Sequence, residues 1–570
     1  MTDTNQAAAE PRRRQHASLA ALGERYFRAQ HTFDPWNATL LGLTEFDHLV
    51  TDPRRSSDEA VIRELTAVEE GLAGLDDDHL DDESVVDRAV LTSLARGART
   101  DAQDALWAAN ASAKSYVSRQ GLVFQALPVM KVDTADSWEA YIERLRALET
   151  MFDRLGERYL EESADDRFPT AVGVRHAIDQ LEGYLGLPLV DDVLLTPALG
   201  HAAGAMATRL MEQSVRPAMS RLADVLRLRL APLARNDDRV GIRYIPGGAA
   251  AYQRAVARHT TTDETPEAIH QIGLDTLSEL QARWRQVGKR VFGVDDFDEI
   301  VRRLRSDPGL RFTTSAEIIQ VAQSALDRAV EAQPRYYPGR VTACAIVEIN
   351  AVEAEHASMA YYRPPAVDGS RPGAHCLLTT DPAQRFRFEY ECLAFHESVP
   401  GHHLQLAMSQ GLDIPRYRRH LDVEACSFNE GWGLYSEKLA EELGLYTSDL
   451  DVLGHLSFLA LRACRLVVDT GMHHLGWSRQ KAVDFMTANT ATTQENIRNE
   501  VDRYIAWPGQ ALAYLMGQRE ILRLREDSRQ ALGSRFDLAD FHATVLGHGP
   551  VPLSVLASTV HHWQQERLSV

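Results

Sequence analysis

The sequence has few cysteines and no long apolar run. Its 570 residues include five cysteines without a C-x-x-C pair, which is typical of reduced, buried thiols rather than of a disulfide framework. No stretch of about 18 apolar residues occurs, as a membrane-spanning helix would need. The N-terminus also lacks the basic, apolar and small-residue pattern of a secretory signal. We therefore expect a cytoplasmic protein with no membrane partner.

The common motifs for nucleotides, flavins and serine nucleophiles are missing as well. The sequence contains no G-x-x-x-x-G-K-[ST] loop, no G-x-G-x-x-G after a predicted strand and no G-x-S-x-G turn. These motifs supply the phosphate-binding loop or the exposed serine that such chemistry needs. A nucleotide or flavin cofactor is therefore not indicated.

Positive charge is also in deficit. The 61 basic residues are outnumbered by 81 acidic ones, which gives a net charge of −20. Such a surface repels a nucleic-acid backbone, so we expect no nucleic-acid partner. The hydrophobic fraction of 44% and the charged fraction of 25% are typical of a folded globular protein.

Apolar residues recur at helical spacing through most of the chain. We expect a disordered tail over residues 1–15, a helical scaffold lobe over 16–235 and a catalytic lobe over 236–570, with one core shared by the lobes. Short β-like segments occur at residues 242–245, 341–349 and 373–380. The pattern predicts a mostly α fold with a small β element near residues 341–380.

The densest group of potential metal ligands is F-H-E-S-V-P-G-H-H-L-Q at residues 395–405. A zinc hydrolase needs imidazoles to hold the ion and a carboxylate to take a proton from water, which His396 and Glu397 would supply. In the usual H-E-x-x-H motif the second histidine lies one helical turn later, where this sequence has Pro400. The helix must therefore break or bulge there. We favour His402 as the second ligand, with His403 as the alternative.

A third ligand is predicted from the segment N-E-G-W-G-L-Y-S-E at residues 429–437. Catalytic zinc keeps three protein ligands and an open position, and Glu430 fits the third place. Glu437 lies nearly on the same helical face and is expected to orient a ligand imidazole. Gly431 and Gly433 weaken this helix, which a close backbone approach or an open cleft would explain.

These strings resemble a known family. The H-E-S-V-P-G-H-H-L-Q and N-E-G-W-G-L-Y-S-E segments, the loop Y-R-P-P-A-V-D-G-S-R-P-G and the segment R-Y-I-A-W-P-G-Q-A-L-A-Y-L-M-G-Q resemble the bacterial proteins of domain of unknown function 885. The resemblance runs from near Phe33 to near Leu532. It implies a large helical fold with a central cleft, similar to the thimet-oligopeptidase, angiotensin-converting-enzyme and thermostable carboxypeptidase groups, with zinc-dependent peptidase or amidase chemistry.

Amide hydrolysis also needs hydrogen-bond donors for the tetrahedral oxyanion. The similar peptidase groups use downstream histidine and tyrosine residues for this purpose. The resemblance therefore makes His473, Tyr504 and Tyr514 candidate catalytic residues, with Arg503 beside them as a candidate for substrate binding.

Three further residues are candidates for substrate binding. The predicted strand at 373–380 offers an edge to which an extended peptide adds as another strand, and His375 would face or flank the cleft. Arg363 and Arg371 precede this strand and are able to bind a substrate carboxylate through two hydrogen bonds.

We favour a zinc hydrolase in which His396, His402 and Glu430 hold the ion and Glu397 acts as general base and then general acid. Its substrate would be a short peptide or an amide-containing small molecule. Imidazole and carboxylate also suit other divalent metals, such as iron or manganese, so a non-hydrolytic metalloenzyme is one alternative. A non-catalytic binding protein that keeps the fold is another. The sequence does not indicate the oligomeric state.

Overall fold

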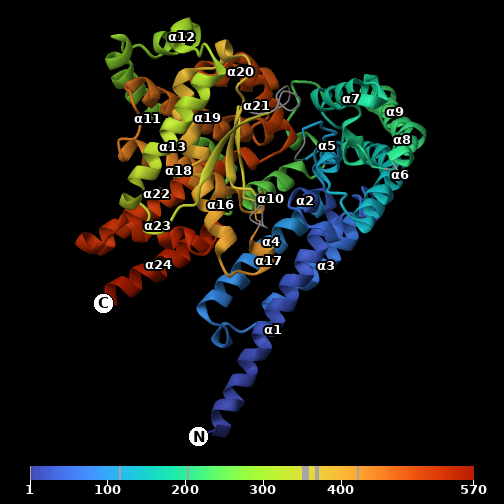
Figure 1. Cartoon of the computed structure of the whole chain (residues 1–570), viewed down its shortest axis with the longest axis horizontal. Helices are drawn as coiled ribbons and strands as arrows, with labels where there is room; N and C mark the ends of the chain where they lie inside the picture. The colour runs from blue at the N-terminus through green and yellow to red at the C-terminus, as the bar shows by residue number, and fades with distance from the viewer. Residues whose placement is uncertain are drawn as a thin grey trace. The chain divides into compact units, whose positions relative to one another are not determined.

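The computed structural model describes residues 2–114, 117–201, 204–349, 359–365, 371–419, 421 and 423–569, with side chains from Glu10 onward. Helices make up most of these residues, and three short strands form one sheet (Figure 1). The predicted fold class, mostly α with a small β element, is confirmed. None of the five cysteines forms a disulfide bond, and four of them are buried.

The chain divides into two compact units. Unit 1 comprises Met1–Ala255, Met472–Gln480 and Asp502–Pro508, and unit 2 comprises Val256–Gly471, Lys481–Val501 and Gly509–Val570. The boundary therefore lies about 20 residues after the predicted one at 235/236, and two short later segments return to unit 1. The composition of these two segments does not mark them as part of unit 1, so the sequence did not predict them.

Unit 1 consists of helices joined by short loops. Its helices are α1 (Thr2–Phe33), α2 (Pro35–Leu40), α3 (Arg55–Ala73), α4 (Asp82–Asp104), α5 (Arg119–Ala126), α6 (Ala135–Ala164), α7 (Ala171–Gly186), α8 (Gly204–Leu210), α9 (Arg216–Val225) and most of α10 (Gly248–Thr260). Helices α1, α3 and α4 pack side by side (Figure 1).

Two local predictions for unit 1 differ from the structure. Helix α1 already begins at Thr2, so it includes most of the segment 1–15 that we expected to be disordered; the alanines at positions 7–9 favour helix. The β-like segment 242–245 forms a single short 3-10 turn, Ile242–Tyr244. A four-residue apolar segment has too little periodicity to separate strand from turn.

Helix α6 carries the centre of the core of unit 1. It begins with a capping box, in which Thr134 accepts from the backbone N–H of Ser137 and the Ser137 side chain reaches back. Its apolar residues recur at three- and four-residue spacing, so Leu145, Leu148 and Leu155 share one face. These three side chains are fully buried, and α6 packs against α9.

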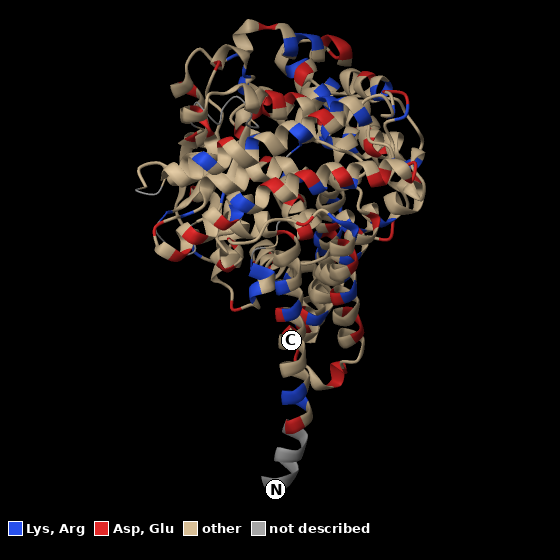
Figure 2. Ribbon diagram, turned by 90° about the vertical axis from the view of Figure 1, so that its right-hand side faces the viewer, with Lys and Arg blue, Asp and Glu red and all other residues tan. Residues whose placement is uncertain are grey.

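Unit 2 contains the remaining helices and the sheet. Its helices are α11 (Pro266–Phe292), α12 (Phe297–Ser306), α13 (Ser315–Ala332), α15 (Tyr390–Glu397), α16 (His402–Gly411), α17 (Arg416–Arg419), α18 (Cys426–Glu442), most of α19 (Asp449–His473), α20 (Arg479–Asn489) and α21 (Gln494–Ala506), and α22 (Ala513–Leu532), α23 (Leu538–Leu546) and α24 (Leu553–Ser569). Acidic and basic residues are interspersed over the ribbon in Figure 2.

The sheet has the strand order β1-β3-β2. Its strands are β1 (Cys344–Glu348), β2 (Ala360–Arg363) and β3 (Gly373–Leu377), with β3 parallel to β1 and antiparallel to β2. Strands β1 and β3 fall within the segments predicted to be β, whereas β2 was not predicted. The loop from Arg363 to Pro372 that the sequence indicated is described except for residues 366–370.

The two faces of the sheet have different surroundings. One face forms a small apolar core that includes Ala374 and Cys376. Because consecutive strand residues point to opposite faces, His375 lies on the other face, beside its register partner Tyr362. The Tyr362 hydroxyl contacts His403 on α16. This second face is therefore the one that meets the predicted metal-ligand segment.

Helices α18 and α22 approach each other closely at Gly431. A Cβ atom at this position would lie 2.6 Å from the Cα of Gly517 on α22, a separation that real Cβ atoms do not tolerate. Of the two explanations that the sequence suggested for Gly431, the structure therefore supports the close backbone approach.

Substitution of Gly431 by alanine is expected to lower the free energy of unfolding by about 1–3 kcal/mol, because α18 and α22 must separate to admit the methyl group. Gly183 in α7 is a matched control: it is exposed, and its Cβ would meet nothing within 4 Å. Gly183→Ala should stabilise the protein by about 0.5–1 kcal/mol. Denaturant unfolding measures both, and equal stability changes would contradict the close approach.

Candidate metal site

The helix break between residues 397 and 402 brings two histidines together. Helix α15 ends at Glu397, and α16 begins at His402, as the proline and glycine predicted. A Cβ at Gly401 would overlap the carbonyl oxygen of His396, so only glycine fits this turn. The Trp432 indole N–H on α18 donates to the carbonyl of Pro400 over 2.8 Å, so a hydrogen bond connects the break to α18.

His396, His402 and Glu430 converge across the break. The Nε2 atom of His396 lies 3.5 Å from Oε2 of Glu430, and Nε2 of His402 lies 3.6 Å from the same oxygen. The two imidazole rings are nearly perpendicular, with centroids 4.8 Å apart, and one ligand atom from each of the three residues lies within 4.8 Å of the others. Donors bound to one tetrahedral zinc ion are separated by about 3.3 Å, so these side chains fit a single ion with small adjustments.

His403 makes different contacts. Its Nδ1 lies 3.0 Å from the Tyr362 hydroxyl, and its Nε2 lies 2.9 Å from the backbone carbonyl of Thr342. Both ring nitrogens are therefore engaged with the sheet side of the site. Of the two histidines that the sequence left open, His402 is the one that lies with His396 and Glu430.

Glu437 holds the first histidine from behind. Its Oε1 accepts from His396 Nδ1 over 2.9 Å, and the Arg462 guanidinium lies 3.4 Å from the same oxygen. Burial alone would raise the pKa of Glu437, but the positive charge of Arg462 and the hydrogen bond from His396 hold it well below its usual range. This carboxylate therefore holds a proton on His396 Nδ1 and turns Nε2 toward Glu430.

The charges of the three converging side chains depend on one another. Burial alone would lower the pKa of His396, but hydrogen bonds to Glu430 and Glu437 raise it to about 9. Burial alone would raise the pKa of Glu430, yet hydrogen bonds from His396 and His402 hold it well below its usual value. The site therefore places concentrated negative charge beside two imidazoles, which is what a divalent cation needs.

Two further residues, Gly433 and Glu397, lie beside the converging side chains. A Cβ at Gly433 would lie 2.7 Å from the His396 ring, so this glycine leaves room for the imidazole. Glu397, the predicted base, follows His396 directly at the end of α15 and is 9% exposed. Its catalytic role stays a prediction.

His375 lies on the site face of the sheet. It is fully buried, and neither ring nitrogen has a hydrogen-bond partner within the part of the chain that the structure describes. Burial, with the charge of His396, lowers its pKa to about 3. His375 is thus a neutral imidazole whose pKa is affected by the charge of His396. Its role in substrate binding stays a prediction.

The two arginines predicted to bind substrate carboxylates lie near this sheet. Arg363 ends β2, and its Nε is buried without a hydrogen-bond partner among described residues. The positive charge of Arg371 acts on the Tyr362 hydroxyl. Among the described residues, neither arginine forms a hydrogen bond or ion pair with His396, His402 or Glu430. Their roles in substrate binding stay predictions.

His473 has a structural position that argues against the predicted catalytic role. Its Nδ1 accepts from the backbone N–H of Ile242 over 3.1 Å, and its Nε2 donates to the carbonyl of Tyr504 over 3.0 Å. Both nitrogens are thus occupied within unit 1, so His473 has no donor left for an oxyanion. The sequence could not show this, because both partners are backbone groups distant in sequence.

The other downstream candidates lie in different units. Tyr504 and Arg503 belong to unit 1, whereas Tyr514 belongs to unit 2 with His396, His402 and Glu430. Tyr514 is 8% exposed, and the guanidinium of Arg465 lies 4.3 Å from its ring centroid. These assignments stay predictions.

Burial of His473 predicts a loss of stability in acid. Its pKa falls from an ordinary 6.5 to about 4 in the folded protein because of desolvation. The unfolded chain therefore binds more protons between these values, and about 3 kcal/mol of stability present above pH 6.5 is lost as the pH falls towards 4. In His473→Gln the unfolding free energy should fall less over this range than in the wild type. Denaturant titrations at several pH values measure this, and parallel curves for both proteins would contradict it.

Several residues of the site gave no sequence signal. Arg462 and His455 on α19 approach Glu437, and Tyr362 contacts His403. Arg462 and His455 belong to no recognisable motif, and Tyr362 begins the Y-R-P-P loop but was given no role. Each reaches the site through packing of elements distant in sequence.

Among the described residues, no helix is long and apolar enough to cross a membrane.

Two solved structures resemble this chain over nearly its whole length. A candidate lipoprotein from Colwellia psychrerythraea is 25% identical, with 96% of this chain and 99% of that chain covered and a TM-score of 0.86. A candidate lipoprotein of unknown function from Shewanella oneidensis is 16% identical, with 95% and 99% covered and a TM-score of 0.75. The second likeness shows the fold alone.

No curated protein matches the chain. A family model described as bacterial protein of unknown function (DUF885) matches residues 35–560. The motifs around His396 and Glu430 had indicated this family. The chain therefore belongs to the DUF885 family.

Proposed function

We propose that the protein is a metal-dependent hydrolase that cleaves amide bonds in short peptides or in a peptide-like small metabolite. The observation that carries the proposal is the convergence of His396, His402 and Glu430 across a helix break. Glu397 next to His396 and Glu437 behind it supply the two carboxylates that such a site needs in addition to its ligands.

The donor set supports a divalent metal. Two imidazoles and one carboxylate are the ligands of several catalytic zinc sites, and non-haem iron enzymes use the same types. Zinc bound here would polarise the substrate carbonyl and make a bound water more acidic. We take zinc as the first metal to test and iron and manganese as the alternatives.

The chain's own residues would divide the remaining work. Glu397 would accept a proton from the attacking water and return it to the leaving nitrogen. Glu437 would keep the His396 proton on Nδ1, so that Nε2 presents its lone pair. Tyr514 and Tyr504 are candidate donors to the developing oxyanion, and His375, Arg363, Arg371 and Arg503 are candidates for holding the substrate.

The likeness to helical zinc peptidases and the central cleft remain part of this proposal. So does the cytoplasmic location. The two structural neighbours are described as candidate lipoproteins, so attachment to a membrane is the alternative. Fractionation of the native host would decide the location here.

The experiment that tests the function combines metal restoration with a substrate screen. Protein stripped of metal by a chelator would be restored separately with zinc, iron(II) and manganese, and each form incubated with a library of short peptides and N-acyl amines. We expect one of the restored forms to cleave a substrate into products whose summed mass exceeds that of the substrate by one water. The metal-free protein should give no such products. A protein that retains metal but cleaves nothing would contradict hydrolysis and favour a binding role or other chemistry.

A further inference from the structure

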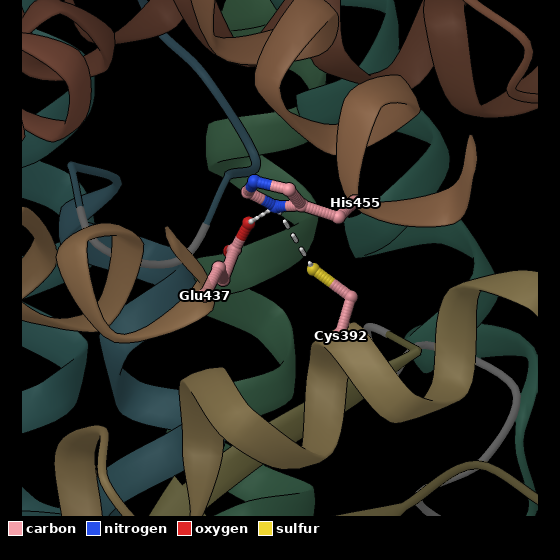
Figure 3. A group of neighbouring side chains, drawn as sticks. All are labelled: Cys392, Glu437 and His455. Atoms are coloured by element: carbon pink, nitrogen blue, oxygen red, sulfur yellow. Dashed lines mark hydrogen bonds and ion pairs between the residues drawn. The ribbon is translucent and has the colours of Figure 1, made fainter. Parts of the chain in front are cut away.

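A second group of potential ligands lies directly behind the first. Cys392 on α15, Glu437 on α18 and His455 on α19 point toward one another (Figure 3). Each of these three side chains is at most 1% exposed. A thiol, a carboxylate and an imidazole thus meet in the interior of unit 2, each from a different helix.

The spacing of the donor atoms fits one metal ion. His455 Nδ1 lies 3.4 Å from Glu437 Oε2 and 3.9 Å from Cys392 Sγ. Ligands of tetrahedral zinc, at about 2.0 Å for nitrogen and oxygen and about 2.3 Å for sulfur, are separated by about 3.3–3.6 Å. All three donor atoms lie within 4.8 Å of one another, so a bound ion would draw them closer together.

The two oxygens of Glu437 serve different neighbours. Oε1 accepts from His396 and lies near Arg462, whereas Oε2 is buried without a hydrogen-bond partner in the described part of the chain. An unsatisfied carboxylate oxygen in the interior is costly. A cation between Oε2, His455 and Cys392 would remove that cost.

The far side of His455 repeats the arrangement around His396. Its Nε2 lies 3.7 Å from the Glu441 carboxylate, which also pairs with Lys438. With Nδ1 on the metal, the proton on Nε2 would point toward that carboxylate. A histidine ligand backed by a carboxylate is the usual environment of metal-bound imidazole.

We propose that Cys392, Glu437 and His455 form a second metal site, specific for a zinc-like ion that prefers thiolate and imidazole ligands. On binding, the Cys392 thiol would lose its proton to solvent and form the metal–sulfur bond. The thiolate and the Glu437 carboxylate would then neutralise the charge of a divalent ion. This inference does not depend on hydrolysis by the first site.

Cobalt(II) is the probe, because cobalt bound to thiolate gives a near-ultraviolet charge-transfer band that nitrogen and oxygen ligands do not give. Full-length protein stripped of metal would be titrated with cobalt(II), and bound metal counted after gel filtration. We expect about two equivalents, one for each mononuclear site, and a sulfur-to-cobalt band.

Three variants assign the signals. Cys392→Ser should lose the sulfur band and one equivalent, whereas Glu430→Gln should lose the other equivalent and keep the band. Cys464→Ser is the matched control, because Cys464 is another fully buried cysteine of unit 2 on α19. It should keep both equivalents and the band.

Absence of a sulfur band in the wild type, with cobalt in excess, would overturn the proposal without reliance on any variant. A band that survives in Cys392→Ser would overturn it as well. Only one bound equivalent in the wild type, with a sulfur band and with the same equivalent retained in Glu430→Gln, would instead contradict only the first site.

Discussion

Glu397→Gln is expected to lower amide hydrolysis about 100- to 10,000-fold, the contribution that a positioned acid–base group makes. Glutamine has nearly the shape of glutamate but cannot accept the proton of the attacking water. Glu397 is not among the three converging ligands, so the metal content should stay unchanged. Measurement of kcat/KM and of bound metal on the same samples checks both parts.

Glu442→Gln is the matched control for this experiment. Glu442 ends α18 and pairs with Arg525 at the surface, and its substitution should leave kcat/KM within the error of the wild type. Full activity in Glu397→Gln would exclude Glu397 as the base. Loss of metal in this variant would show that Glu397 acts as a ligand instead.

Loss of Glu430 should weaken metal binding more than loss of Glu437. At the site of His396, His402 and Glu430, Glu437 contacts the ligand His396 and not the ion itself. Glu437→Ala should therefore raise the dissociation constant of this site about 10- to 100-fold. Glu430→Ala removes one of the three ligands, so it should raise the dissociation constant by more than this. Competition with a chromogenic chelator measures both constants.

This comparison belongs in a Cys392→Ser background, so that only the site of His396, His402 and Glu430 binds metal. Glu441→Ala is a control on the same helix, because it contacts His455 rather than His396. Equal losses for Glu430→Ala and Glu437→Ala would contradict the division between ligand and positioning residue.

Much of the candidate site could be predicted because its chemistry is local in sequence. His396 and Glu397 are adjacent, and Pro400 with Gly401 predicts a helix break from backbone chemistry alone. The unusual Gly431 and Gly433 indicated tight packing, which the structure places at α22 and at the His396 ring. The sequence favoured His402 but left His403 as the alternative, since one residue of helical rotation decides which ring faces Glu430.

The rest depends on contacts between distant segments. Strand β2 is four residues long and was not predicted, because so short a segment carries little pattern. The catalytic expectation for His473 rested on residue type, whereas backbone groups of Ile242 and Tyr504 decide its environment. The group of Cys392 and His455 went unnoticed because 63 residues separate them and neither lies in a metal motif.

We propose above all that His396, His402 and Glu430 hold one metal ion. The most direct test is elemental analysis of His402→Ala and His403→Ala beside the wild type, after exposure to zinc and removal of unbound metal. His402→Ala should lose about one equivalent per chain, as a single three-ligand site requires, and His403→Ala should lose none. Equal metal content in all three proteins, or loss in His403→Ala alone, would contradict the site.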